Sequence, residues 1–371
     1  MEKKYRFVVG ITMTAIGIYL LLAPKPPIAL IPGEFEQQEA LLVAYEKQPS
    51  NQAYREIHEK QRLTLIDIIV ECHTSVDIKL LVSDDESYQS AKTHLAARNV
   101  ELDNIEFIHQ PFDSMWMRDY CPIQLNTASG NREWLDFDYY MPGDSWINEQ
   151  GIRQDRADDD NVISRLAKIE GVPVRSVDIA LHGGAMLSNG GNILLVSKAV
   201  FDWNEERHQL SPEQTKARFT KTFPNYHIEY VMPLADEPTQ HLDMFVVFTS
   251  RNTVVVGSYS IHMDYINHMR LNSVARQLAQ LTVNGKPLIV ERIDMPPHGR
   301  NNFGGSYTNV VFANGTLLLP DYKIDSAGLA KATTLYNRLL PNWNIRTIDS
   351  THLIVMEGAL HCVTGNIPAV E

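Results

Sequence analysis

Cys362 is the residue of clearest chemical interest, and it lies in the stretch GALHCVTGNIPAVE near the C-terminus. Free cysteine is among the most frequently buried residue types, so one interpretation is a small core residue. The other is a nucleophile, which needs a base from elsewhere in the chain. The three cysteines, Cys72, Cys121 and Cys362, lack the C-x-x-C spacing of a zinc ribbon or a thioredoxin-type site.

His241 and Asp243 lie directly ahead of an apolar run, in QHLDMFVVF. The run is typical of a β-strand, in which side chains at positions i and i+2 share a face. We therefore expect His241 and Asp243 to point the same way, as a base and its charge partner would. A polar strand end that faces solvent is the alternative for this pair.

Asp119 follows Trp116 and Arg118 in DSMWMRDYCPIQL. An Arg-Asp pair is often a surface ion pair worth less than about 1 kcal/mol. Trp116 and the two adjacent methionines would need cover on a surface, so we expect a buried strand end at which Asp119 meets a cation. A structural aspartate at a strand end is the alternative.

Four more residues at expected strand ends could bind a substrate. His182 precedes Gly183 and Gly184, and paired glycines indicate a tight turn or a close approach of the backbone to a ligand. The GxGxxG and GK[ST] patterns of phosphate loops are absent from the sequence. Asn309 begins another predicted strand.

Together, Cys362, His241, Asp119 and Asp243 favour chemistry on a guanidino group. Two carboxylates can bind the N–H edges of a planar guanidinium through charge-assisted hydrogen bonds. A thiolate can attack the central carbon, and a histidine can give a proton to the departing ammonia and then take one from water. The product is a ureido group, and the substrate cation lowers the pKa of the thiol.

Composition narrows the choice of partners. The 371 residues are 44% hydrophobic and 21% charged, which is typical of a globular protein. The formal net charge of -12 argues against nucleic acid as the main partner, because phosphate binding requires a basic surface. The same charge weakly favours cationic ligands.

The N-terminal residues indicate export. A basic start precedes an uncharged apolar run over residues 7–23, and PKPP follows it. We expect residues 1–23 to be a signal or signal-anchor segment, so that the body of the protein is extracytoplasmic, either membrane-anchored or secreted after cleavage. A buried core helix is the weaker alternative, because the run has no polar face. Residues 24–33 form a Pro-rich linker, and residues 34–371 form one domain.

That domain repeats one plan, an apolar strand, a turn and a second apolar strand. The turns fall near Gly190, Asn252 and Gly315, about sixty residues apart, and about five such units would fill the body. EALLVAYEKQPS and MWMRDYCPIQL are the candidate strands of earlier units. A mixed α/β repeat of this kind places its units around an axis, with loops that meet at a central cleft.

Helices are predicted between these strands. SPEQTKARFTKTF opens with Ser211 as N-cap and Pro212 at the first helical position. In MDYINHMRLNSVARQLAQL, an apolar stripe begins with Ile266, Met269 and Leu271.

At these residues the sequence resembles the agmatine deiminase and bacterial-type peptidylarginine deiminase family. The resemblance runs from GEFEQQEALLVAY to ALHCVTGNIP and rests on WMRDYCP, LHGGAML, HLDMF, YTNVVFANGTLLLP and the final His-Cys pair. It implies a pentein fold, a five-bladed α/β propeller of ββαβ units, and catalysis without a metal or an organic cofactor. It also implies that Trp116 and Asn309 line the substrate pocket.

The same resemblance implies the catalytic roles. Cys362 would be the nucleophile and His241 the general acid and base, while Asp119 and Asp243 would hold the guanidinium. His182, Gly183 and Gly184 are added to the expected substrate-binding residues.

The branch of the family is less clearly marked. LHGGAML and GALHCVTGNIP are more similar to the peptidylarginine branch, since the agmatine branch has Glu where this chain has His182. Cys121 stands where Gly is usual, Ala185 stands where Asn is common, and YYMPGDSW lacks the Arg-Pro repeat of the peptidylarginine branch. Arg153 and Arg156 lie slightly further on, and they either bind a substrate carboxylate or form salt bridges beside a helix.

The main prediction is a deiminase that hydrolyses peptidylarginine to citrulline and ammonia. The alternatives are an agmatine deiminase, which yields N-carbamoylputrescine, an amidinotransferase with the same thiol intermediate, and a membrane-anchored guanidine-binding protein without activity. A metal site of His241, Asp243 and Cys362 is disfavoured, because mixed thiolate and carboxylate ligation without paired-ligand spacing is uncommon for structural zinc.

Overall fold

The computed structural model describes residues 29–126, 130–139, 156–297 and 304–370. The predicted signal segment, residues 1–23, lies outside these ranges, and the predicted linker is described only from residue 29. Within these ranges, no helix has both the length and the apolar character that crossing a bilayer requires.

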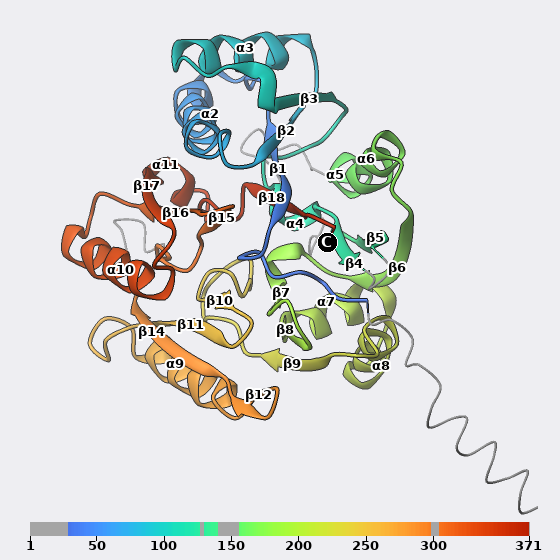
Figure 1. Ribbon diagram of the computed structural model, residues 1–371, viewed down its shortest axis with the longest axis vertical. Helices are drawn as coiled ribbons and strands as arrows, with labels where there is room; N and C mark the ends of the chain where they lie inside the picture. The colour runs from blue at the N-terminus through green and yellow to red at the C-terminus, as the bar shows by residue number, and fades with distance from the viewer. Residues whose placement is uncertain (1–28, 127–129, 140–155, 298–303, 371) are drawn as a thin grey trace, which may run out of the picture.

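Five sheets of three or four strands surround the centre of the molecule (Figure 1). In four of them, a hairpin of two antiparallel strands is extended by a third strand that runs parallel to its neighbour. These sheets are β4 (Ile123–Asn126), β5 (Arg132–Asp138) and β6 (Val174–Ala180); β7 (Met186–Ser188), β8 (Ile193–Ser197) and β9 (His227–Val231); β10 (Val246–Ser250), β11 (Thr253–Ser258) and β14 (Ile289–Asp294); and β15 (Val311–Ala313), β16 (Thr316–Asp321) and β17 (Asn344–Asp349). A short ribbon pairs β12 (Thr282–Val283) with β13 (Lys286–Pro287).

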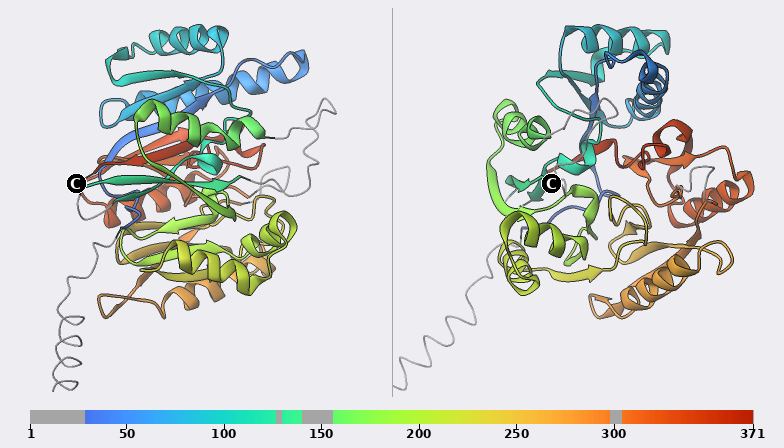
Figure 2. Two further views of the ribbon diagram at one scale, coloured as in Figure 1. Left: turned by 90° about the vertical axis from the view of Figure 1, so that its right-hand side faces the viewer. Right: turned by 180° about the vertical axis from the view of Figure 1, so that it is seen from behind.

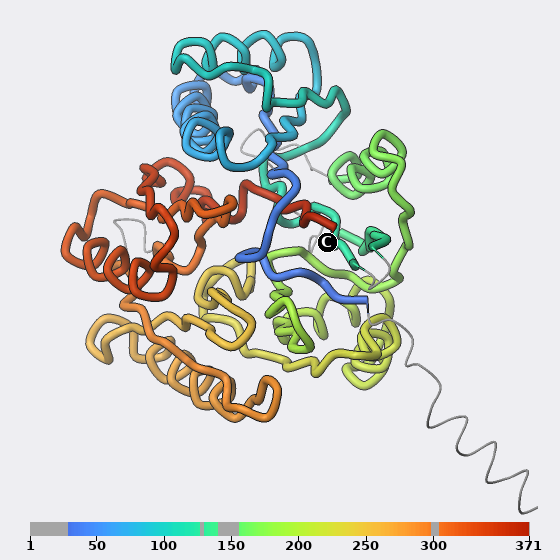
Figure 3. Tube along the Cα trace, viewed as in Figure 1, coloured from blue at the N-terminus to red at the C-terminus, as the bar shows by residue number. Residues whose placement is uncertain are grey.

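The fifth sheet is built from both ends of the described chain. Its order is β18 (Thr364–Pro368), β1 (Gln38–Tyr45), β2 (Asp77–Val82) and β3 (Ile105–His109). β18 runs antiparallel to β1, and β1, β2 and β3 are parallel. The C-terminal strand therefore takes the place that the first hairpin strand has in the other sheets, and Figure 3 shows it beside β1 near the centre.

The long helices lie toward the outside of the sheets, as the views from the front and from behind both show (Figures 1 and 2). They connect strands that run parallel, which a short turn cannot do. The helices of eight residues or more are α2 (Gln52–Cys72), α3 (Asp85–Ala97), α6 (Val162–Glu170), α7 (Ala199–His208), α8 (Pro212–Thr222), α9 (Tyr265–Leu278) and α10 (Ser326–Leu339). Shorter helical turns are α4 (Met117–Tyr120), α5 (Ala157–Asp160), α11 (Thr351–Ile354), η1 (Leu102–Asn104) and η2 (Gly183–Ala185).

Several predicted elements are confirmed. The chain is mixed α/β, and the three predicted hairpins are β7–β8, β10–β11 and β15–β16. Gly190 and Gly315 have φ values of +69° and +92° in their turns, a region that glycine adopts without strain. α8 begins at Pro212 with Ser211 as its N-cap, and Ser211 and Gln214 form the reciprocal capping box.

The predicted stripe of α9 is partly wrong. Ile266 and Met269 are exposed, at 52% and 48% of their surface. The buried face instead begins with Asn267 and continues through Leu271 and Val274. These positions keep the helical spacing of four and three residues, and the Asn267 side chain bonds the backbone of Ala235, so a polar residue occupies the inner position.

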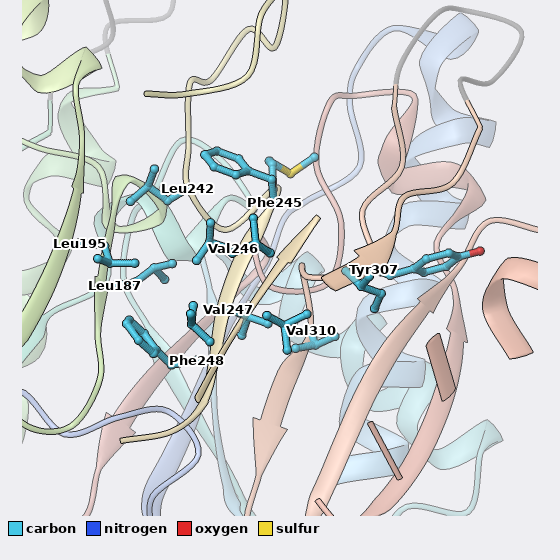
Figure 4. Close-up of a cluster of buried hydrophobic side chains, with 14 of the residues drawn as sticks. Leu187, Leu195, Leu242, Phe245, Val246, Val247, Phe248, Tyr307 and Val310 are labelled. Carbon is cyan, nitrogen blue, oxygen red and sulfur yellow. The ribbon is translucent and has the colours of Figure 1, made fainter. Parts of the chain in front are cut away.

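The hydrophobic core passes from one sheet to the next. Figure 4 shows one cluster that contains Leu187 and Leu195 of the β7–β8 hairpin, Val246 and Phe248 of β10, and Val310 beside β15. The same cluster includes Leu242, Met244 and Cys362. The segments that carry the predicted site residues are therefore anchored by burial of their apolar neighbours.

Candidate active site

The predicted site residues come from five segments with equivalent places in the fold. Each segment precedes the strand that lies at the inner end of its sheet, and Figure 1 shows these five strands near the centre. Asp119 precedes β4, Gly183 and Gly184 precede β7, His241 and Asp243 precede β10, Asn309 precedes β15, and Cys362 precedes β18. This equivalence explains how residues 119 and 362 reach one place.

Two local expectations are wrong. Asp119 lies on the helical turn α4 and not at the end of a strand. The strand begins only at Val246, after both His241 and Asp243. Asp243 lies in a turn closed by hydrogen bonds from Phe245 N and Val246 N to Leu242 O, 2.9 and 2.8 Å long, and His241 directly precedes this turn. The alternation of a strand therefore does not set the directions of these two side chains.

Cys362 is buried among polar groups. Its Sγ lies 3.2 Å from Asn309 Nδ2 and 3.9 Å from Asp243 Oδ2, and the residue is 5% exposed. Burial and the negative charge of Asp243 raise the pKa of the Cys362 thiol well above its ordinary value. A cation placed beside the sulfur would offset both effects and favour the thiolate.

Asp243 and Asp119 each present a free carboxylate oxygen. Asp243 Oδ2 accepts a 2.6 Å hydrogen bond from His361 Nδ1. Asp243 Oδ1 and Asp119 Oδ1 are buried and have no hydrogen-bond partner within the described part of the chain. Burial and the charge of Asp243 raise the pKa of Asp119 well above its ordinary value. Two unpaired acceptors of this kind beside a thiol form a site for a cation that donates hydrogen bonds.

His241 lies between Asp119 and His182. Its Nδ1 is 3.6 Å from Asp119 Oδ1, and its Nε2 is 3.0 Å from Nδ1 of His182. Burial lowers the pKa of His241 to about 4, although the charge of Asp243 opposes this shift. The imidazole is therefore neutral near pH 7, which is the protonation state that a general base needs.

The paired glycines allow this close packing. A Cβ atom on Gly184 would lie 2.6 Å from His241 Nδ1 and 3.1 Å from Asp243 Oδ2. A Cβ atom on Gly183 would lie 2.0 Å from Arg118 O. Gly184 O also accepts hydrogen bonds from the backbone of Leu242 and Asp243. The glycines therefore permit a close approach of backbone to site residues, and a role in holding substrate stays a prediction.

Trp116 and Asn309 both lie beside the site. A Cβ atom on Gly358 would meet the Trp116 ring at 2.2 Å, so this ring packs against the segment that leads to Cys362. Asn309 Oδ1 accepts a 2.9 Å hydrogen bond from His361 N, while its Nδ2 faces the Cys362 sulfur. Asn309 therefore fixes the backbone beside the thiol.

Sequence reasoning missed a buried ionic network behind Asp243. Glu34 lies 2.7 Å from Arg118 and 2.9 Å from His361 Nε2. Burial opposes ionisation of Glu34, but Arg118 and His361 hold its pKa at about 2. Burial and Arg118 disfavour the charged form of His361, but Glu34 and Asp243 outweigh them and raise its pKa. Glu34 and His361 stood in quoted motifs, but no local pattern indicates that they meet.

Several residues that depart from the family pattern are buried. Cys121 is buried against Gly365, whose added Cβ would lie 2.6 Å from Cys121 Cβ. Ala185 is fully buried. Arg156 is 5% exposed and pairs with Asp159 at 3.3 Å, so the salt-bridge interpretation fits it. Arg153 lies outside the described residues.

A cavity of about 430 Å³ adjoins the site. Its wall includes Met244, whose sulfur is 3.5 Å from Asn309 Nδ2, and Glu237, which accepts a bond from His241 N. Four carboxylates line it, and no basic side chain does so among the described residues. The carboxylates belong to Asp236, Glu237, Asp264 and Glu357.

Comparison with known proteins gives a consistent result. The family model of the Porphyromonas-type peptidyl-arginine deiminase matches residues 30–368. A putative agmatine deiminase of Latilactobacillus sakei is 24% identical over 380 residues, which cover 94% of this chain and 99% of the relative. The agmatine deiminase of Pseudomonas aeruginosa is 21% identical over 311 residues, 76% of this chain and 80% of the relative.

Solved structures of similar fold include a putative arginine deiminase from Porphyromonas gingivalis, with a TM-score of 0.77 and 21% identity over 92% of this chain and 98% of that one. The agmatine deiminase of C. jejuni has a TM-score of 0.75 and 20% identity over 93% of this chain and 98% of that one. At these identities the two structures establish a shared fold.

Proposed function

This chain belongs to the Porphyromonas-type peptidyl-arginine deiminase family, and from that premise we propose that it converts agmatine to N-carbamoylputrescine and ammonia. The chain is a guanidino-group deiminase, a hydrolase of carbon–nitrogen bonds. Peptidylarginine is the main substrate that the sequence predicts. The names of the curated relatives favour the agmatine alternative.

One observation carries the proposal, a pair of buried carboxylate oxygens near Cys362 that have no hydrogen-bond partner among the described residues. Asp119 Oδ1 and Asp243 Oδ1 are buried acceptors, and Asp243 also contacts the thiol. A guanidinium supplies N–H donors on two edges and a positive charge, so it satisfies both oxygens at once. It also places an electrophilic carbon near the sulfur.

The proposed reaction uses four of the predicted residues. The Cys362 proton passes to His241, and the sulfur bonds to the guanidinium carbon, which Asp119 and Asp243 hold. His241 then returns the proton to one nitrogen, the C–N bond breaks, and ammonia departs. The carbon stays bonded to the sulfur as a thiouronium cation. Water gives a proton to His241 as its oxygen adds to the carbon. The C–S bond breaks, the thiolate takes a proton from the new hydroxyl, and the ureido product is released. His241 gives its proton to the released ammonia, which leaves as ammonium, and the imidazole is neutral again.

The acidic cavity supports agmatine over a peptide with a C-terminal carboxylate. Agmatine carries an ammonium group at the end opposite its guanidinium. The carboxylates of Asp236, Glu237, Asp264 and Glu357 lie in the cavity that adjoins the site. They attract a second cation and repel a carboxylate. Arg156, a candidate for carboxylate binding, is paired with Asp159.

Peptidylarginine is the second candidate, because the matching family model bears that name. We test both by incubating the protein with agmatine, free arginine and a peptide with C-terminal arginine, and by measuring ureido product and ammonia. We expect kcat/KM for agmatine to exceed the other values at least tenfold. A higher kcat/KM for the peptide would favour a peptidylarginine deiminase instead. The absence of ureido product from every guanidine would refute the proposed function.

Two further proposals concern the arrangement of the sheets and the N-terminal segment. We propose that the five sheets form the five-bladed propeller of the pentein fold, which the pairing of β18 with β1 supports. We also propose that residues 1–23 export the chain, because a basic start precedes their apolar run. Fractionation of cells that express the full chain tests export, and recovery of the protein only from the cytoplasm would refute it.

A further inference from the structure

Asp119, His182 and His241 offer a second chemistry in addition to their places beside Cys362. One ligand atom from each of the three residues lies within 4.8 Å of the other two. His182 and His241 are 3% and 2% exposed. Asp119 Oδ1 is buried and has no hydrogen-bond partner among the described residues. This set differs from the disfavoured set of His241, Asp243 and Cys362, because it contains two imidazoles and no thiolate.

We propose that Asp119, His182 and His241 bind a first-row transition-metal dication of the Zn²⁺ or Co²⁺ type, and that the bound ion inhibits the enzyme. Two imidazoles and one carboxylate are a ligand set that Zn²⁺ prefers, with room for water as the fourth ligand. Binding of the ion rests on the geometry alone. Its inhibitory effect rests on the proposed function.

The spacing of the two imidazoles fits such an ion. Nδ1 of His182 and Nε2 of His241 are 3.0 Å apart and share one hydrogen bond. Two nitrogens bound tetrahedrally at about 2.0–2.1 Å from zinc are about 3.4 Å apart. The rings need to separate by only a few tenths of an ångström. Both lone pairs then bind the ion, and the proton of the hydrogen bond moves to the other nitrogen of its own ring, so that each imidazole stays neutral.

Neighbouring groups hold both rings in place. The His182 ring stacks on Trp203 with centroids 4.3 Å apart, and the Tyr139 ring meets its edge at 5.0 Å. The His241 ring meets Trp203 edge-on, with centroids 6.3 Å apart, and Glu237 accepts a hydrogen bond from the backbone N–H of His241. Oriented ligands bind a metal more tightly than mobile ones, because less conformational entropy is lost.

The ion and the guanidinium compete for the same groups. The ion occupies Asp119, one of the two proposed guanidinium ligands, and His241, the proposed acid and base. Its positive charge also repels the substrate cation. Inhibition is therefore expected to be competitive with agmatine and reversible by a chelator.

The direct test is titration of the Cys362→Ser protein with Co²⁺, followed by visible absorption. The serine removes the thiolate as a competing ligand. We expect one Co²⁺ per chain, with d–d bands of a four- or five-coordinate site, and an affinity at least tenfold lower after a further His182→Gln change. His262→Gln, at an exposed histidine, is the matched control and is expected to leave the affinity unchanged.

Two outcomes would overturn the proposal. One is the absence of stoichiometric Co²⁺ binding, and the other is binding that His182→Gln leaves unchanged. If His182→Gln misfolds by circular dichroism, Asp119→Asn takes its place with the same expectation. Because no turnover is needed, a failure of metal binding is distinct from a failure of the deiminase proposal. In the active protein, Zn²⁺ is expected to raise the apparent KM for agmatine, and an unchanged KM would refute the inhibitory role.

Discussion

At the scale of residues, the proposed function depends on carboxylate oxygens that have no hydrogen-bond partner in the described part of the chain. Asp243 shows how this is achieved, because His361 takes one of its oxygens at 2.6 Å and leaves the other without a partner in the described structure. Glu34 binds the far side of His361 and keeps this imidazole in position. Burying these charges costs desolvation free energy, and a cation that enters the site offsets this cost.

We expect Asp243→Asn and Asp119→Asn each to lower kcat/KM for agmatine about 100-fold or more, since each removes a charge-assisted hydrogen bond to the guanidinium. Ammonia release gives the rate. Asp294→Asn, at an exposed aspartate that lies outside the site, is the matched control and should keep the full rate. Equal activity of the site variants and the control would contradict the assignment of the guanidinium ligands.

Glu237 gives a prediction about pH. Burial raises its pKa from 4.5 to about 7, so the folded protein keeps this proton to higher pH than the unfolded chain does. The stability contributed by the proton is complete below pH 4.5 and is lost as the pH rises through about 7. From pH 4.5 to pH 8, the wild-type protein should lose about 2 to 3 kcal/mol relative to Glu237→Gln. Urea unfolding at several pH values measures the difference, and parallel pH profiles would contradict it.

At the scale of elements, sequence patterns predicted strands and turns better than they predicted the segments that carry the site. Alternating apolar residues and Asn/Gly turns identify hairpins, because these signals are local. α4 was expected as part of a strand, and the turn at residues 242–245 was expected as a strand start. Both depart from the regular pattern because contacts with distant segments, such as the bonds to Gly184 O, fix their conformation.

Gly184 tests how closely these segments must approach. In Gly184→Ala, the new Cβ would lie 2.6 Å from His241 Nδ1, so we expect His241 to be displaced and kcat/KM to fall about 100-fold. Gly171→Ala is the control, because no atom lies within 4 Å of its added Cβ and its φ is +64°. That variant should lose about 1 kcal/mol of stability and keep its turnover. Full activity of Gly184→Ala would show that the close contact is not required.

At the scale of the whole molecule, the site exists because the two ends of the described chain meet in one sheet. β18 follows Cys362 directly and pairs with β1, and Gln124 Nε2 bonds Pro368 O at 2.7 Å, which ties β18 to β4. The repeated plan and the nature of the four proposed catalytic residues were readable from the sequence. The network of Glu34, Arg118 and His361 was not, because Glu34 and His361 are 327 positions apart and no local pattern links them.

We expect deletion of residues 364–371 to abolish ammonia release and to lower the melting temperature, because β1 loses one of its two neighbouring strands and Cys362 loses the strand that positions it. Circular dichroism follows the melting. Deletion of residues 370–371 alone leaves β18 intact and serves as the control. Turnover by the chain that lacks residues 364–371 would contradict this account of closure.

The proposed mechanism requires that the Cys362 sulfur bond to the guanidino carbon during turnover. Rapid acid quench of the protein with agmatine, followed by intact-protein and peptide mass spectrometry, tests it most directly. We expect an adduct on Cys362 with the mass of agmatine less one ammonia. In Cys362→Ser we expect neither an adduct nor turnover. Turnover by Cys362→Ser, or an adduct on Cys72 or Cys121 in its place, would contradict the claim.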